Sequence, residues 1–276
     1  MSSDEALDTA PYDYAIQCVG LTKEYVLGQD LSLRRSLRRA LRPWRPVPIG
    51  RFTALNELTF TVPRGAFFGI VGPNGSGKST LTQVISGITV PTAGEARVVG
   101  RVLPLLEVGA GFHEELTGRE NVFLLGAILG LTTREVVATL DRIIDFAGVH
   151  AHFDTPMKRY SSGMRARLSF ATAICFPAEI FVFDEVLAVV DDDFRFRCQR
   201  ALATLNREGS TIIFMSHDLD LVTEICSSGM WIERGRARYI GPIDEVASAY
   251  RAGVPAESVD SVDAPSDIEA NTGLLQ

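Results

Sequence analysis

Short apolar runs divide the chain into segments that are typical of β-strands. Three runs are apolar almost throughout and predict strands buried within a sheet, at 67–71, 180–183 and 210–215. Residues 15–19 alternate weakly and predict an edge strand, whereas 53–62 alternate clearly and predict a second strand. Further strands are predicted at 96–99, from 103 into a glycine-rich loop, and in a hairpin at 230–240 that turns at Arg234 and Gly235.

Helical periodicity dominates the segment between two of these strands. Three helices are predicted there, at 122–131, 133–147 and 166–174. Thr117 and Glu120 have the spacing of a capping box ahead of the first helix. We therefore expect residues from about 113 to 177 to form a helical subdomain inserted between strands of the core.

Residues 31–45 combine leucine and arginine on opposite faces of a predicted helix. Leu33, Leu37, Leu41 and Trp44 share one narrow sector, and five arginines cover the opposite side. Such a helix suits a membrane interface, where the arginines meet anionic headgroups and the leucines enter the acyl boundary. The alternatives are a solvated basic face whose leucines pack on the domain, and contact with nucleic acid, which no other basic stripe supports.

Composition and charge indicate a folded globular protein and argue against nucleic-acid binding. Its 276 residues with 46% apolar content suffice for one large domain or two small ones, and the net charge of −7 argues against wholesale nucleic-acid binding. The four cysteines are far apart, which predicts buried thiols in a reducing cytosol rather than disulfides or a zinc site. No stretch approaches the run of about 20 apolar residues that crosses a bilayer.

The two ends of the chain are polar. Residues 1–13 are acidic and unlike a signal peptide, and we expect them to be disordered. A closing helix is predicted at 243–250, and the acidic segment 253–276 is expected to be a flexible tail. The folded domain is therefore expected to cover residues 14–252.

A glycine-rich loop between a predicted strand and a predicted helix carries the clearest chemistry. Residues 72–80 follow the pattern G-x-x-x-x-G-K-[ST], whose backbone N–H groups wrap around a polyphosphate at the positive end of the next helix. Lys78 is expected to reach the β- and γ-phosphates, and Ser79 to complete the shell of a magnesium ion. The ATP-binding residues predicted in this loop are Gly72, Asn74, Gly75, Ser76, Gly77, Lys78, Ser79 and Thr80.

Two later strands are each followed by residues that suit phosphate chemistry. The run at 180–183 ends in Asp184 and Glu185, and the carboxyl ends of parallel strands line the ligand crevice in folds of this kind. Asp184 is expected to hold Mg²⁺ and Glu185 to act as the general base on the attacking water, whereas two solvated acids are the plainer alternative. His217, after the run at 210–215, is placed to contact a γ-phosphate or orient the water.

Two further segments have both a functional and a structural explanation. Ser161 and Gly163 precede a predicted helix, an arrangement that binds anions, although a serine N-cap explains the same pattern. Tyr25 follows the first strand, where an aromatic ring suits stacking on adenine or is simply half-buried.

Over about residues 15–250 these motifs resemble the nucleotide-binding subunits of ABC transporters. The phosphate loop resembles Walker A, 161–164 the signature motif, 180–185 Walker B and His217 the switch histidine. The expected fold class is α/β, with a P-loop NTPase core, an antiparallel β-subdomain and an inserted helical subdomain. The resemblance implies that two chains meet head to tail, so that the signature motif of one chain caps the ATP on the other. The residues implied to bind ATP in trans are Ser161, Ser162, Gly163, Met164 and the D-loop Asp191.

Within that family, three passages resemble the exporters of polysaccharides such as O-antigen, capsule and teichoic acid. They are 105–113, 116–121 and 185–191, the last of which replaces the Pro-Thr-Ser-Ala-Leu-Asp segment usual after Walker B. The insertion that holds residues 31–45 also resembles this subfamily. Glu107 stands where most ABC ATPases place the glutamine that contacts magnesium, and the signature reads Ser-Ser-Gly-Met instead of Ser-Gly-Gly-Gln.

The resemblance implies an ATPase subunit that uses ATP and Mg²⁺, pairs with a second copy of itself and drives a polytopic membrane permease, in two copies. Its expected place is the cytoplasmic face of the bacterial inner membrane, with residues 31–45 in contact with anionic lipid or with the permease. The implied cargo is a lipid-linked polysaccharide. The alternatives are a lipid or drug exporter built on the same ATPase, and a soluble ABC ATPase acting on ribosomes or DNA. ATPases of that soluble class usually carry two ATPase domains or long coiled coils, and neither is visible in this sequence.

Overall fold

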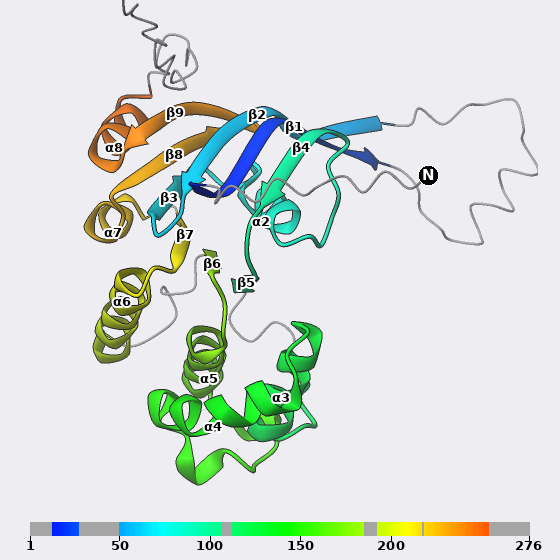
Figure 1. Cartoon of the computed structure of the whole chain (residues 1–276), viewed down its shortest axis with the longest axis vertical. Coiled ribbons are helices and arrows are strands. Elements are labelled where there is room, and N and C mark those ends of the chain that lie inside the picture. The colour runs from blue at the N-terminus through cyan, green and yellow to red at the C-terminus, as the bar shows by residue number, and fades with distance from the viewer. Residues whose placement is uncertain (1–12, 28–49, 106–111, 185–191, 217, 254–276) are drawn as a thin grey trace, which may run out of the picture.

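Two β-sheets and a set of helices make up the fold. The computed structural model describes residues 13–27, 50–105, 112–184, 192–216 and 218–253. Three strands form an antiparallel sheet in the order β2-β1-β4, and six form a second sheet in the order β5-β6-β7-β3-β8-β9 (Figure 1). The arginine-rich helix predicted at 31–45 lies outside the described residues.

In the antiparallel sheet, the predicted position of the first strand at the edge is wrong. Its strands are β1 (Tyr14–Leu27), β2 (Gly50–Pro63) and β4 (Ala93–Val98). The predicted edge strand at 15–19 belongs to β1, which pairs on both sides and is therefore the central strand. The prediction was wrong because weak alternation indicates only how the two faces of a strand are buried. The number of neighbouring strands depends instead on pairing with segments far along the chain. Bulges near Gly20 also interrupt the alternation.

The six-stranded sheet is parallel except at one edge. Its strands are β5 (Val102–Leu105), β6 (Ile180–Asp184), β7 (Thr211–Ser216), β3 (Phe67–Val71), β8 (Ser228–Glu233) and β9 (Arg236–Pro242). The three apolar runs predicted as buried strands are β3, β6 and β7, and they lie side by side in the middle of the sheet. Only β8 and β9 pair antiparallel, through the predicted hairpin.

Both faces of this sheet are buried, which explains the continuous apolar runs. Along β3, Phe68 and Ile70 face a core shared with the antiparallel sheet and with α2 (Lys78–Ile85). Phe67 and Val71 belong to a second core, shared with the other helices. Because successive side chains of a strand point to opposite faces, a strand covered on both sides needs apolar residues at every position.

The segment between β5 and β6 is helical. Its helices are α3 (Gly118–Ile128), α4 (Thr133–Ala147) and α5 (Ser162–Cys175), with short 3₁₀ turns at His150–His152 and Met157–Arg159. The predicted capping box of α3 is present, and α4 has a second one that was not predicted. In Figure 1 these helices form a group below the sheets.

Three more helices complete the described part of the chain. They are α6 (Asp192–Arg207), α7 (Leu219–Ile225) and α8 (Ile243–Ala252). The predicted fold class is confirmed, because an antiparallel sheet and a helical insertion accompany a parallel P-loop core. All four cysteines are buried free thiols, as expected. Among the described residues, none of the helices is long and apolar enough to span a membrane.

Candidate functional site

The ends of three parallel strands define the candidate site. Val71 at the end of β3 pairs with Ser216 at the end of β7, and Asp184 at the end of β6 pairs with Met215. The glycine-rich loop after β3, the acidic end of β6 and the chain that follows β7 therefore emerge at one edge of the sheet. This edge is where parallel α/β folds bind ligands.

Close packing fixes the shape of the glycine-rich loop. A side chain at Gly72 would overlap the carbonyl oxygen of Ile232 in β8. Gly77 has a φ of +112°, and a Cβ there would lie 2.6 Å from the carbonyl oxygen of Ala54. Since only glycine meets both demands without strain, these two residues hold the loop against β2 and β8.

The hairpin turn between β8 and β9 also supports the loop, which the sequence analysis missed. The Gly235 N–H donates to the Ser76 carbonyl at 2.8 Å, and the Gly235 carbonyl accepts from the Asn56 N–H at 2.9 Å. Gly235 thus links the loop to β2. The sequence predicts that Gly235 lies in a two-residue turn. The residues next to that turn in the sequence do not indicate which other segment the turn contacts.

Lys78 is almost enclosed by the loop, with 6% of its surface exposed. Its Nζ donates to the carbonyl oxygens of Gly72 at 2.6 Å and of Pro73 at 3.2 Å. A buried ammonium group needs such oxygens to compensate for lost water. The positive charge is therefore held inside the loop, where it can attract an anion.

Two further features of the loop suit a bound phosphate. The buried Ser76 hydroxyl has no hydrogen-bond partner among the described residues, although an unsatisfied buried hydroxyl costs about 1–3 kcal/mol. Gly77 caps α2 without a side-chain hydrogen bond, and the first turn of α2 carries no acidic residue. The positive end of α2 therefore faces the loop without a compensating charge from that turn.

Tyr25 is half-buried and lies beside α2. Its hydroxyl hydrogen-bonds to Oε1 of Gln83 in α2 at 3.3 Å, and the ammonium of Lys23 lies 5.2 Å from the ring centroid. Both explanations offered by the sequence are compatible with this position. The stacking of Tyr25 on adenine stays a prediction.

The segment 161–164 begins α5. Ser161 is the N-cap, and its hydroxyl accepts from the Met164 N–H at 3.1 Å, so the structural explanation of this serine holds. Met164 packs on the core of the helices, whereas Ser161 and Ser162 are exposed. Apart from its neighbours and its own helix backbone, the nearest described atoms to a Cβ on Gly163 would be Arg167 at 3.9 Å and Ser161 at 4.0 Å, so the described fold does not require glycine there. Anion binding in trans stays a prediction.

Several predicted residues cannot be placed. Glu107, Glu185, Asp191 and His217 lie outside the described residues. For Asp184 the structure describes the backbone at the end of β6. Their predicted roles therefore rest on the sequence and on the strand ends that precede them.

Comparison with known proteins places the chain among ABC transporter ATPases. A family model described as ABC transporter matches residues 55–188. The chain is 38% identical to the O-antigen export system ATP-binding protein RfbB of Myxococcus xanthus, covering 92% of this chain and 58% of that protein. It is 36% identical to the RfbB protein of Klebsiella pneumoniae, covering 84% of this chain and 95% of the relative.

A second kind of relative and a solved structure point the same way. The teichoic acids export ATP-binding protein TagH of Bacillus cereus is 38% identical, over 72% of this chain and 36% of TagH. A dimeric ATP-binding cassette in a post-hydrolysis state, bound to ADP and Pi, superposes with a TM-score of 0.67 at 18% identity, covering 83% of this chain and 98% of that one. The chain belongs to the ABC transporter family. It is an ATPase of that family, and the role of the loop at 72–80 in binding phosphate stays a prediction.

Proposed function

We propose that this ATPase drives the export of a lipid-linked polysaccharide across the bacterial cytoplasmic membrane, working at its cytoplasmic face with a separate membrane permease. The observation that carries this proposal is the agreement between relatives named for O-antigen export and for teichoic acid export, at 36–38% identity. The chain spans 58% of the length of the Myxococcus protein and 36% of the length of TagH.

The chemistry is assigned to the chain's own residues. Lys78 would exchange the loop carbonyls for phosphate oxygens, and the Ser76 hydroxyl would gain the partner that it lacks among the described residues. The exposed Ser79 hydroxyl and Asp184, at the end of β6, supply oxygen donors of the kind that Mg²⁺ prefers. The metal would neutralise charge on the phosphates, while Glu185 takes a proton from the attacking water and His217 orients it.

A second copy of the chain would complete the site. In this proposal Ser161, Ser162, Gly163 and Met164 of one chain cover the nucleotide bound to the loop of the other, together with Asp191. The exposed serines and the open space at Gly163 support this arrangement, because a partner can approach them closely. The solved cassette that superposes on this chain is itself a dimer.

Deletion of the gene in its source bacterium tests the cargo. We expect the surface polysaccharide to be lost and its lipid-linked precursor to accumulate in the cell. The wild-type gene should restore export, whereas Lys78→Met should not, because the substitution removes the charge that holds the phosphates. Near-normal surface glycan in the deletion strain would instead favour an exporter of lipid or drug.

A further inference from the structure

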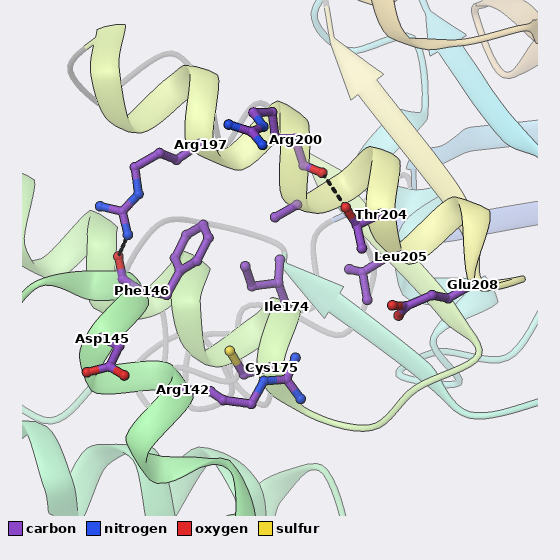
Figure 2. Close-up of a pocket in the computed structure, with 11 residues that line it drawn as sticks. Arg142, Asp145, Phe146, Ile174, Cys175, Arg197, Arg200, Thr204, Leu205 and Glu208 are labelled. Atoms are coloured by element: carbon purple, nitrogen blue, oxygen red, sulfur yellow. Dashed lines mark hydrogen bonds between the residues drawn. The ribbon is translucent and has the colours of Figure 1, made fainter.

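A groove between α4, the end of α5 and α6 has no part in the proposed catalysis. It encloses about 560 Å³ and has an apolar floor that includes Phe146, Ile174 and Leu205. Figure 2 shows Arg197 and Arg200 on the α6 side of this groove and Arg142 on the α4 side. A cavity with an apolar floor and three guanidinium groups at its sides suits a ligand that is both anionic and apolar.

Among the described residues, these three arginines have no carboxylate partner of the kind that other arginines have. Arg119 and Arg251, for example, pair with carboxylates at 2.7 and 2.8 Å. No described carboxylate forms an ion pair or hydrogen bond with Arg142, Arg197 or Arg200. Arg197 donates to the Phe146 carbonyl at 2.8 Å and lies 4.9 Å from the Phe146 ring, so its position is fixed by α4.

Two acids also line the groove, but neither neutralises these arginines. Asp145 is engaged with His150, at 2.8 Å. Glu208 lies at the far end of the groove in Figure 2, next to Leu205. The groove therefore keeps an excess of positive charge, although the whole chain carries a net charge of −7.

We propose that the groove binds the acidic segment 254–276 of the same chain. This segment contains five acidic residues and no basic one. The acids are Glu257, Asp260, Asp263, Asp267 and Glu269. Valines, Ile268 and a pair of leucines lie between or after them, so the segment offers apolar side chains as well as charge. The segment is therefore both anionic and partly apolar, which matches the arginines and the apolar floor of the groove.

The segment begins on the correct side of the molecule. It leaves α8, whose Arg251 pairs with Asp220 in α7, and Glu224 of α7 accepts a hydrogen bond from Gln199 in α6 at 3.3 Å. Figure 1 shows α8, α7 and α6 in succession along one side. An extended chain covers about 3.3 Å per residue, and tethering raises the local concentration of the segment at the groove. A bound segment would join α4 of the helical insertion to α6 of the core.

Cysteine cross-linking in the full chain tests this proposal. Thr204 is exposed on α6 at the groove, and Ser261 lies among the acids of the segment. Under mild oxidation at low salt, Thr204→Cys with Ser261→Cys should form a monomer-sized intramolecular disulfide. The rate should fall about fivefold in 1 M salt, or when Arg142 and Arg200 are both replaced by serine, as expected for a few partly exposed charge pairs.

The matched control pairs Ser261→Cys with Ser248→Cys, an exposed position on α8. Its rate reflects tethering alone and should not respond to salt or to the arginine substitutions. Thr204→Cys by itself should give no disulfide with the buried Cys175. If the groove pair is as insensitive as the control, or if its main product joins two chains, the segment does not bind the groove of its own chain.

Discussion

Substitution of Gly163 by alanine separates a structural from a functional reason for glycine at the start of α5. Within this chain the added Cβ would lie 3.9 Å from Arg167 and 4.0 Å from Ser161, so nothing has to move. Replacing glycine by alanine within a helix stabilises the folded state by up to about 1 kcal/mol. Gly163→Ala should therefore raise the melting temperature by about 2–4 °C.

The same methyl group should impair turnover. If the start of α5 covers the nucleotide of a second chain, the methyl group enters a contact that exists only in the dimer. We expect the ATPase rate to fall about tenfold, which corresponds to roughly 1.4 kcal/mol of lost transition-state stabilisation. The assay is phosphate release at protein concentrations that support dimers, together with a thermal melt of the same preparation.

Gly118→Ala is the matched control, since Gly118 also lies in the first turn of a helix. There the Cβ would overlap the Tyr160 hydroxyl and lie 2.9 Å from the Phe153 carbonyl oxygen. This variant should lose about 1–3 kcal/mol of stability, as overpacked sites do. A Gly163→Ala protein that is both stable and fully active would refute the placement of Gly163 against a second nucleotide.

Three further predictions follow from particular residues. Lys78→Met should abolish the rise in melting temperature on adding ATP while changing the nucleotide-free melting temperature little, as differential scanning fluorimetry can show. Hydrogen bonds from the Thr132 backbone and hydroxyl, with help from Arg101, lower the pKa of Glu135 from 4.5 to about 2. Its contribution to stability is complete above pH 4.5 and is lost as the pH falls toward 2, so melts of Glu135→Gln and wild type should converge in acid. Burial raises the pKa of Cys18 to about 12 and of Cys175 to about 11, so a thiol reagent should react slowly with the native protein and with all four thiols after unfolding.

The sequence predicts strands and helices well where burial is uniform along an element. The runs that became β3, β6 and β7 are apolar at every position because both faces of the central sheet are covered. The position of β1 within its sheet could not be obtained in this way, since it depends on pairing with β2 and β4. The helix α6 was missed altogether, although Phe194, Cys198 and Leu202 recur at four-residue spacing and are buried.

The candidate site was predictable to the extent that its chemistry lies in one continuous segment. The loop at 72–80 combines glycine, lysine and serine at fixed spacing, and these residues act together because they are adjacent. The support from Gly235 and the arginine groove between α4 and α6 arise from elements distant in sequence. The proposed contact of Gly163 with a second chain depends on how two chains pair, not on a local sequence pattern.

The most direct test of the account is the state of Glu185→Gln in solution with ATP and Mg²⁺. Without its general base the protein should bind ATP, hydrolyse it very slowly and sediment as a dimer, and adding Gly163→Asp should return it to an ATP-bound monomer. Undiminished turnover in Glu185→Gln would contradict the assignment of the base. A dimer that persists with Gly163→Asp would contradict the composite site.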